Sequence, residues 1–580
     1  MINFRQMIAV LLEEVLEGLG RDEIAAMVEI PAESRMGDYA FPCFRLAKAM
    51  RKAPPLIAAE VAGKLGGAGA EIFEKTEAVG GYVNMFLKKD VLLSAVVAEA
   101  LEKGDAYGSS EMGRGRKVVV EFSSPNIAKP FHIGHIRSTV IGNAINNLYS
   151  FMGYDTVRVN HLGDYGTQFG KMIVAYRKWG SREDVENQPI KTLLEYYTRF
   201  HEEAEKDASL EEEARLAFAR LEQGAVEERE LWQWFRDESL KEFSRVYAML
   251  GIGFDSYAGE SFYSDKMGRV LDLLREKGLL AESEGAQIVD LEAWDMPPAL
   301  ITKKDGSTLY ITRDIAAAIY RKEHYDFYKN IYVVASQQNL HFRQWIKVIE
   351  LMGFDWAGDC EHIPFGLVSL EDGVMSTRAG RVVFLEDVLN RAVERTREIV
   401  IEKNVNTDNI DETARQVGIG AVIFQELSNS KIKDYVFSWD KILNFEGETG
   451  PYVQYSHARA CSVLRRDAGP EGRLAEAAAC GNGATGLDLS YIAGESAYEL
   501  AKALYRFPEA VVEAGEKYEP SILTRHVVDV AQAFNKFYHD EHILVENEDE
   551  KLAKLALTAA ARQVIRNGLR LLGMEAPERM

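Results

Sequence analysis

Residues 117–135 read KVVVEFSSPNIAKPFHIGH. The β-branched run Val118–Phe122 predicts a short buried strand, and the turn-forming residues Ser123–Asn126 end it. A helix is predicted from near His132, because apolar residues follow at helical spacing until Gly153 stops them. Strand, polar loop and helix together predict the first half of a βαβ unit.

The start of this helix has the composition of an anion-binding site. Free backbone N–H groups at a helix start attract anions, and Gly134 has no Cβ to keep a phosphate away from the backbone. His132 and His135 are three residues apart, so both imidazoles project from one face of the first turn. Two histidines on a helix can also be a satisfied core pair, but the strand and loop before them favour nucleotide binding.

His132–His135 forms the signature motif of class I aminoacyl-tRNA synthetases, and the longer stretch SSPNIAKPFHIGHIRST closely resembles arginyl-tRNA synthetases. The resemblance covers essentially the whole chain, with the motifs in the family's order. It implies an enzyme that ligates L-arginine to the 3′ end of tRNA(Arg) in two steps. Arginyl-adenylate forms from ATP with release of pyrophosphate, and the arginyl group then moves to the terminal ribose.

Composition and charge limit the class of protein. The chain has 580 residues, enough for several domains, and 47% hydrophobic with 27% charged residues is ordinary for soluble globular protein. There is no membrane-length apolar run and no signal peptide, and four scattered cysteines favour a reducing cytoplasm. A net charge of −22 argues against nucleic acid when taken alone, although local basic faces can still bind RNA.

The alternation of strands and helices predicts an α/β fold with a doubly wound (Rossmann-like) parallel sheet. After the first strand, further strands are expected at Thr156–Asn160, Ile331–Ala335 and His362–Val368, and a hairpin with Asp305-Gly306 at its turn. The expected domains are a small N-terminal α/β domain (1–112), the catalytic domain (113–390) with a helical insertion at about 181–250, a helical connector (391–450) and an all-α bundle (451–580). The resemblance implies that the first of these contacts tRNA, although a plain docking domain remains an alternative.

Activation of an amino acid is an in-line attack by its carboxylate on the α-phosphorus of ATP. That carboxylate needs no base at neutral pH, so the protein must hold two anions together and neutralise the phosphates. We assign His132, His135 and Lys129 to the phosphates, with Gly134 permitting their approach.

The second signature motif of the class, Lys-Met-Ser-Lys-Ser, corresponds here to Val374–Arg378. Val374 and Thr377 replace its two lysines, and Arg378 follows. Arginyl-tRNA synthetases often lack the second lysine and carry one upstream of the first motif, so we expect Lys129 to supply the missing charge. The further expected ATP contacts are His362, Gly366, Met375, Ser376 and Thr377, with Arg378 as a catalytic cation.

A guanidinium is planar and always charged, so burying it requires carboxylates. The resemblance places two acids and two polar groups around the guanidinium, and two further residues near the amino and carboxylate groups of the substrate. These are Glu260, Asp314, Tyr310 and Gln338 for the guanidinium, and Ser124 and Asn126 for the other groups. From residue type alone, Asp314 could instead cap its helix and Glu260 could be a solvated loop acid.

The C-terminal bundle resembles the anticodon-binding domain of the family. Tyr452, Gln454, Tyr455 and Arg459 supply the stacking and hydrogen-bonding groups that unpaired bases need, although such residues are also common in helix cores and surfaces. The expected partners are tRNA(Arg), L-arginine and ATP as its magnesium complex. No dedicated metal site and no membrane association are expected, and the protein is expected to be a cytoplasmic monomer.

Two other functions stay open from the sequence. One is another class I synthetase or a related nucleotidylyltransferase, against which Glu260, Tyr310 and Asp314 argue. The other is a catalytically inactive tRNA-binding relative, against which the intact His132 and His135 argue. Pyrophosphate exchange with each amino acid separates the three possibilities.

Overall fold

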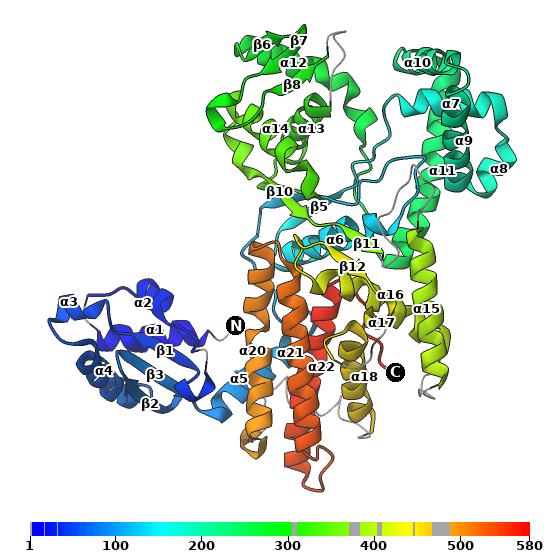
Figure 1. Ribbon diagram of the computed structural model, residues 1–580. Coiled ribbons are helices and arrows are strands. Elements are labelled where there is room, and N and C mark those ends of the chain that lie inside the picture. Colours follow the sequence, from blue (N-terminus) through cyan, green and yellow to red (C-terminus); the bar gives the residue numbers. More distant parts are fainter. Residues whose placement is uncertain are drawn as a thin grey trace. The chain divides into compact units, whose positions relative to one another are not determined.

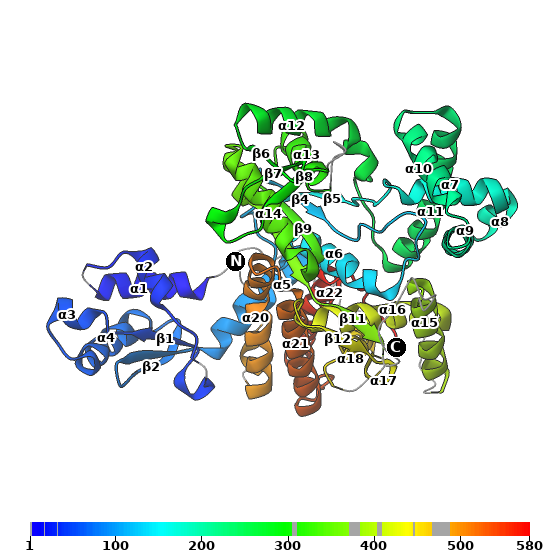
Figure 2. The ribbon, with the colours of Figure 1, turned by 45° about the horizontal axis from the view of Figure 1, so that its top comes forward.

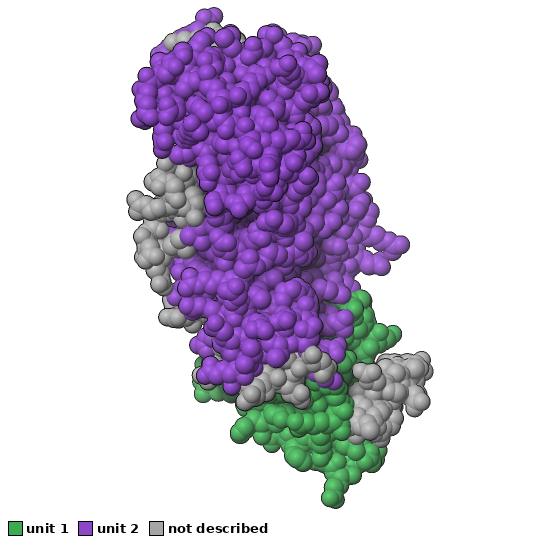
Figure 3. All heavy atoms as spheres, turned by 90° about the vertical axis from the view of Figure 1, so that its right-hand side faces the viewer, with its two compact units in different colours: residues 1–107, 459–507, 529–565 green, residues 108–458, 508–528, 566–580 purple. Residues whose placement is uncertain are grey.

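A computed structural model describes residues 3–16, 18–31, 33–303, 310–370, 383–402, 409–442, 444, 447–466, 488–492 and 494–580. The chain forms two compact units, each built from separate segments (Figure 3). Unit 1 contains residues 1–107, 459–507 and 529–565, and unit 2 contains residues 108–458, 508–528 and 566–580.

A four-stranded parallel sheet organises unit 2. Its strands are β4 (Lys117–Glu121), β5 (Asp155–Val159), β9 (Lys329–Ala335) and β10 (Cys360–Phe365), in the spatial order β10-β9-β4-β5. The predicted doubly wound parallel sheet is therefore confirmed. The strand order reverses between β4 and β9, and at such a switch point the carboxyl ends of the strands flank a ligand crevice.

Helices pack on this sheet because their apolar residues recur at helical spacing. The helix α6 (Ile136–Phe151) follows β4, and α14 (Asn339–Leu351) connects β9 to β10. The helices α13 (Tyr310–Tyr325) and α14 lie beside the sheet (Figures 1 and 2). The helix α13 buries Ile311, Ile315 and Ile319 in one apolar core with Val119 of the sheet and Trp345 of α14.

The segment predicted as a helical insertion, about 181–250, is helical. It contains α8 (Arg182–Asn187), α9 (Pro189–Ala204), α10 (Ser209–Glu222) and α11 (Val226–Leu250), and α7 (Gln168–Trp179) precedes it. Part of its acidic charge is compensated locally, since Arg177 pairs with Glu227 and Glu228. After η4 (Glu260–Lys266) and α12 (Met267–Glu276) comes a small antiparallel sheet of β6 (Leu280–Ser283), β7 (Ala286–Val289) and β8 (Ala299–Thr302). The predicted turn at Asp305-Gly306 lies outside the described residues.

The prediction of one strand over His362–Val368 is wrong. The strand β10 ends at Phe365, and β11 (Val368–Leu370) pairs in parallel with β12 (Tyr435–Phe437) in a separate two-stranded sheet. The change of direction falls at Gly366, where an added Cβ would lie 2.6 Å from Asp434 Oδ1. A glycine is required at this position because no side chain fits.

The rest of the described chain of unit 2 and the C-terminal region are mainly helical, as predicted. The helices are α15 (Leu385–Glu402), α16 (Ile410–Ser428), α17 (Trp439–Ile442), α18 (Gly450–Arg466), η8 (Leu489–Ile492), α20 (Glu495–Glu516), α21 (Pro520–Asp540) and α22 (Glu548–Leu571). Of the helices in the described ranges, none combines the length and apolar character that a bilayer crossing requires.

Unit 1 contains the predicted small α/β structure. Its elements are α1 (Phe4–Val15), α2 (Arg21–Met27), η1 (Ser34–Met36), β1 (Tyr39–Pro42), α3 (Leu46–Met50), α4 (Pro54–Ala68), β2 (Phe73–Val79), β3 (Tyr82–Leu87), α5 (Lys89–Lys103) and η2 (Gly104–Ala106). The three strands form an antiparallel sheet in the order β1-β3-β2.

This N-terminal structure is attached to α20 within the same unit. Asp38 Oδ2 accepts hydrogen bonds from Leu87 N at 2.9 Å and from the Tyr498 hydroxyl at 2.6 Å. The Tyr107 hydroxyl, which is buried, donates to the carbonyl oxygen of Leu504 at 3.1 Å. Asp38 therefore has a structural role.

Candidate active site

The loop after β4 has an unusual backbone path. Ser123, Ser124 and Ala128 have positive φ angles of 68°, 46° and 58°, a region that costs free energy for residues other than glycine. Ser123 is fixed by contacts of its backbone N–H with Ser138 Oγ and of its hydroxyl with that of Tyr247, at 2.9 and 2.8 Å. Packing thus fixes a strained loop at the carboxyl end of a parallel strand.

Ser124 and Asn126 connect this loop to the one that follows β5. Ser124 Oγ accepts a hydrogen bond from His161 N at 3.2 Å. Asn126 bridges to Gly163, where an added Cβ would lie 2.3 Å from Asn126 Oδ1. The two loops are therefore in close backbone contact beside the switch point.

The two signature histidines cap the start of the helix. His132 Nδ1 accepts from Gly134 N at 3.1 Å, and His135 Nδ1 accepts from His132 N at 3.2 Å. Burial lowers the pKa of His132, and burial together with His132 lowers the pKa of His135 to about 3. Both rings are neutral at neutral pH. His132 Nδ1 accepts, so the proton of that ring is on Nε2, whereas His135 Nδ1 also lies 3.3 Å from the carbonyl oxygen of His132 and can instead donate to it. The pair can donate hydrogen bonds but supplies no positive charge.

The residues Met375, Ser376, Thr377 and Arg378 lie outside the described residues. The segment that follows them is attached to the first signature motif: Ile133 N donates to Val383 O at 3.2 Å, and Leu385 N donates to Phe131 O at 2.9 Å. His132 forms an antiparallel bridge with Phe384. The backbone that follows the second signature motif is thus hydrogen-bonded to the backbone just before α6.

His362 and Gly366 lie on and just after β10. The His362 ring stacks on Phe342 with centroids 4.1 Å apart, and its Nε2 donates to Val334 O at 3.0 Å. Burial lowers the pKa of His362, so this ring is neutral. Gly366 is held through its backbone by Lys431 and Arg137.

Glu260 begins η4 and is positioned by the loop after β5. Its backbone N–H donates to Leu162 O at 2.9 Å. The buried Asp164 accepts from Ser261 N at 2.8 Å and pairs with Arg236 at 3.1 Å. Asp164 therefore orients the segment that carries Glu260.

Glu260 already pairs with a guanidinium of the chain itself. Its Oε2 lies 3.2 Å from Arg313 Nη1, and the Arg313 guanidinium also lies over the rings of Tyr165 and Tyr310, at 5.1 and 5.8 Å. Burial raises the pKa of Glu260 to about 7; Arg313 acts in the opposite direction, and Asp314 adds to the increase. The carboxyl thus lies where it can accept a planar cation between aromatic rings.

Asp314 is the residue after Arg313 on α13, and its Oδ2 lies 2.5 Å from His341 Nε2 on α14. Its negative charge acts on Glu260, so the two acids share one electrostatic environment. Gln338, at the start of α14, is exposed, and Tyr310 is 60% exposed. The structure thus brings Glu260, Tyr310 and Asp314 together.

Lys129 acts electrostatically on both Glu260 and His135. Its positive charge lowers both the pKa of Glu260 and that of His135, although burial is the larger influence on each. Lys129 thus lies in the electrostatic field of both groups, one expected to bind the guanidinium and the other the phosphates.

The four residues proposed for tRNA differ in their surroundings. Gln454 is fully buried, and its amide donates to the carbonyl oxygens of Gln416 and Glu575 at 3.1 and 2.9 Å. Tyr455 is 40% exposed and Tyr452 is half-buried. Arg459 donates to Asn535, and its guanidinium lies over the ring of Tyr538 at 5.1 Å. Gln454 thus binds backbone groups of the chain itself, whereas part of the Tyr455 side chain lies at the surface.

Sequence reasoning missed two side chains at this site. Arg313 lies between Tyr310 and Asp314 in the sequence, two residues that were assigned to the guanidinium. Its positive charge beside these residues was the feature of the sequence that could have indicated a role in the site. His341 ends the polar run after β9, which the sequence showed without assigning a role to the histidine. Arg313 pairs with Glu260 and His341 pairs with Asp314, the two acids that the sequence assigned to the guanidinium.

Comparison with known proteins agrees with this geometry. Residues 96–439 match the family described as tRNA synthetases class I (R), catalytic domain; residues 453–580 match the DALR anticodon binding domain and residues 3–87 the arginyl tRNA synthetase N terminal domain. The parallel sheet, the signature histidines and these matches define a class I aminoacyl-tRNA synthetase.

Full-length relatives identify the family. The chain is 58% identical over 580 residues, all of both proteins, to the arginine–tRNA ligase of Clostridioides difficile, and 56% identical over the same length to that of Halothermothrix orenii. The arginyl-tRNA synthetase of Thermus thermophilus has the same fold, with a TM-score of 0.79 and 26% identity over 100% of this chain and 99% of that one. The chain belongs to the arginyl-tRNA synthetase family. It ligates arginine to tRNA(Arg) through an aminoacyl-adenylate, with ATP as a substrate.

Proposed function

We propose that the start of α6 holds the phosphates of ATP while the acids beside it hold the side chain of arginine. His132 and His135 donate hydrogen bonds to phosphate oxygens, Gly134 permits their approach, and Lys129 supplies positive charge. His362 and Gly366, together with Met375, Ser376, Thr377 and Arg378, complete the nucleotide contacts. The neutral state of both imidazoles supports this division of roles, since hydrogen-bond donors and charge then come from different residues.

The substrate guanidinium is bound by Glu260 and Asp314, with Tyr310 and Gln338 beside it, and Ser124 and Asn126 contact the amino and carboxylate groups. The pairing of Glu260 with Arg313 carries this proposal, because it shows that the carboxyl accepts a guanidinium beside an aromatic ring. The substrate must displace or share that partner. The recognition is selective, since an uncharged side chain could not replace the Arg313 guanidinium at the largely buried Glu260 carboxylate.

The reaction needs no protein nucleophile. A carboxylate oxygen of arginine forms a bond to the α-phosphorus, the bond to the β-phosphate oxygen breaks, and pyrophosphate leaves with that electron pair. A hydroxyl of the terminal ribose of tRNA then attacks the arginyl carbonyl and AMP leaves. The protein holds the reacting atoms in line and stabilises the charge on the phosphates.

Further parts of the proposal concern the setting of the reaction. ATP binds as its magnesium complex, with the ion held by phosphates rather than by a dedicated protein site. Tyr452, Tyr455 and Arg459 contact anticodon bases. The protein is cytoplasmic, which is supported by the buried Cys43, Cys360 and Cys461, since these cysteines form no disulfide among the described residues. The chain acts as a monomer. The domain bounds are 1–112, 113–390, 391–450 and 451–580; the family matches over residues 3–87 and 453–580 support the first and the last domain. Light scattering with and without tRNA measures the molar mass and tests whether the chain is a monomer.

The experiment that tests the function is arginine-dependent charging of total tRNA, with pyrophosphate exchange measured for each of the twenty amino acids in the presence of tRNA. Exchange with arginine alone supports the assigned site. Exchange that depends on a different amino acid would contradict the roles of Glu260 and Asp314.

The pKa of Glu260 predicts how arginine binding depends on pH. Burial raises this pKa to about 7, and the guanidinium requires the ionised carboxylate, whose fraction falls about tenfold per pH unit below the pKa. We expect KM for arginine to rise as pH falls through about 7, by up to about tenfold per pH unit, and to become constant above about pH 8. Exchange assays across this range measure it. Glu260→Gln should raise KM and remove the pH dependence, whereas a flat profile of the unmodified enzyme would contradict the assignment.

A further inference from the structure

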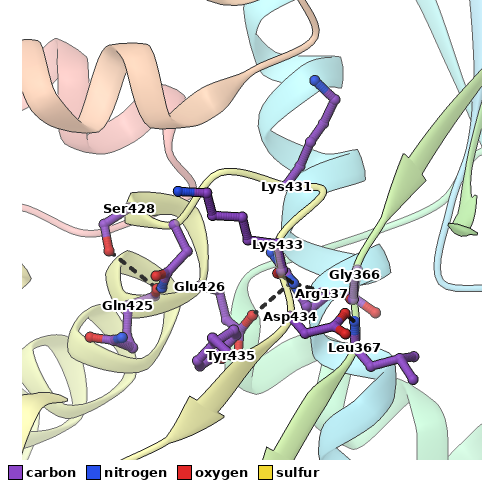
Figure 4. A network of polar contacts seen from close by, with 12 residues as sticks. Arg137, Gly366, Leu367, Gln425, Glu426, Ser428, Lys431, Lys433, Asp434 and Tyr435 are labelled. Atoms are coloured by element: carbon purple, nitrogen blue, oxygen red, sulfur yellow. Dashed lines mark hydrogen bonds and ion pairs between the residues drawn. The ribbon is translucent and has the colours of Figure 1, made fainter.

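Arg137 is the second residue of α6, two positions after the signature motif, and its side chain is fully buried. Its Nη1 donates to the carbonyl oxygens of Gly366 and Lys433 at 3.1 and 2.7 Å, and its Nη2 donates to that of Ser430 at 3.3 Å. One guanidinium on the signature helix thus binds three carbonyls from two distant chain segments (Figure 4). Only arginine offers several donors in such a planar arrangement.

The two segments that Arg137 contacts are also bound to each other. Gly366 N donates to Lys431 O at 2.8 Å, Leu367 N donates to Asp434 Oδ1 at 2.6 Å, and Tyr435 N donates to Leu367 O at 3.1 Å. These bonds lead directly into the pairing of β11 with β12. A displacement of the loop near Lys433 would therefore displace β11 as well.

A buried carboxyl stands beside the guanidinium. Glu426 Oε2 on α16 lies 3.6 Å from Arg137 Nε, and Glu426 also accepts a hydrogen bond from the Tyr435 hydroxyl on β12. Burial raises the pKa of Glu426 to about 8 although the charge of Arg137 lowers it. At neutral pH the guanidinium is thus held largely by backbone carbonyls, so its donor geometry matters in addition to its charge.

Both flanks of the second signature region are attached to the start of α6. The strand β11 ends at Leu370, and residues 371–382, which include Val374–Arg378, follow it in the sequence. The opposite flank pairs through Val383 and Leu385 with the backbone around His132. The flank at β11 reaches the same helix through Arg137.

We propose that Arg137 is a positioning residue for adenylate formation, which fixes β11, the amino-terminal flank of the second signature motif, relative to the phosphate-binding start of α6. The inference rests on the assignment of His132 and His135 to the phosphates. In-line phosphoryl chemistry depends strongly on position, and a displacement of about 1 Å can cost about 10²-fold in rate.

The test is pyrophosphate exchange by Arg137→Lys in the full-length enzyme with tRNA present. Lysine keeps the charge but has a single nitrogen, so it cannot bind all three carbonyls. We expect kcat to fall and KM for ATP to rise, with kcat/KM for ATP lower by about 10–100-fold. We expect KM for arginine to stay within about twofold, because Glu260 and Asp314 do not depend on β11.

Two further variants separate positioning from general destabilisation. Asp434→Ala removes the acceptor of the Leu367 N–H group, which joins the two segments that Arg137 binds, and should change the ATP parameters in the same direction. The matched control is Arg415→Lys on α16, where the guanidinium bridges Glu412 and Glu575 at 2.7 Å each. That variant should lower the melting temperature without changing either KM.

The inference is overturned if folded Arg137→Lys has the ATP kinetics of the unmodified enzyme, or if KM for arginine rises as much as KM for ATP. If Arg137→Lys does not fold, the same criteria applied to Asp434→Ala decide. His132→Ala and His135→Ala are measured in parallel. Unchanged ATP kinetics in those two variants would count against the phosphate assignment itself, whereas unchanged ATP kinetics only in the Arg137 and Asp434 variants would count against this inference alone.

Discussion

Lys129→Ala is expected to lower kcat for arginyl-adenylate formation by about 10²–10³-fold, with little change in KM for arginine. The reason is the charge state of the signature histidines. Burial keeps His132 and His135 neutral, so the charge that develops on the phosphates must be met by a cation. Lys129 lies in the preceding loop, and its charge acts on His135. Pyrophosphate exchange with saturating arginine and tRNA measures the effect.

Two variants control this prediction. Lys129→Arg retains the charge and should recover part of the rate. Lys117→Ala removes a positive charge from the other end of β4, where Lys117 lies 3.5 Å from Asp155, and should leave the rate unchanged. A near-normal rate of adenylate formation in Lys129→Ala would show that this lysine does not compensate for Val374 and Thr377.

Asp314→Asn is expected to raise KM for arginine by about 10–100-fold, since hydrogen bonds to a charged group contribute roughly 1.5–3 kcal/mol. Asparagine has the same shape, and its carbonyl oxygen can still accept from His341, so the fold should persist. It carries no charge and would place an amide donor against the donors of the guanidinium. KM for ATP should not change, and exchange assays at varied arginine and varied ATP give the two constants separately.

The matched control for this prediction is Asp326→Asn, the same substitution just after the end of α13. Asp326 is largely exposed and pairs with Lys322 at 3.0 Å, so its variant should bind arginine normally. If Asp314→Asn left KM for arginine unchanged, Asp314 would be a structural partner of His341 and no more.

Local sequence patterns were sufficient to predict the central sheet. The strands β4 and β9 are largely buried runs rich in β-branched residues, and β5 has β-branched residues at three of its five positions, so the sequence of each strand was enough to predict it. The break after β10 could not be predicted in this way. It arises because Gly366 packs against Asp434, 68 residues later, and no pattern near Gly366 records that contact. The small sheet of β6, β7 and β8 was missed because each strand has only four residues, too few for a clear alternation of buried and exposed side chains.

The candidate site shows the same limit. His132, His135 and Gly134 belong to one short motif, so their proximity follows from the local helix. The pairing of Glu260 with Arg313, and of Asp314 with His341, joins elements far apart in the sequence. Residue type also could not reveal which side of a helix faces inward: Gln454 is polar, yet it is buried and binds backbone carbonyls.

The discontinuous composition of unit 1 has a consequence for biosynthesis. Phe4 packs against Tyr505 with ring centroids 5.3 Å apart, and Tyr107 stacks on Phe507 at 6.3 Å. The segment 1–107 leaves the ribosome about 350 residues before the segment 459–507, a delay of roughly 20–70 s at about 5–20 residues per second. For that interval the nascent chain carries aromatic side chains whose native neighbours have not yet been translated, and these are the surfaces that holding chaperones bind.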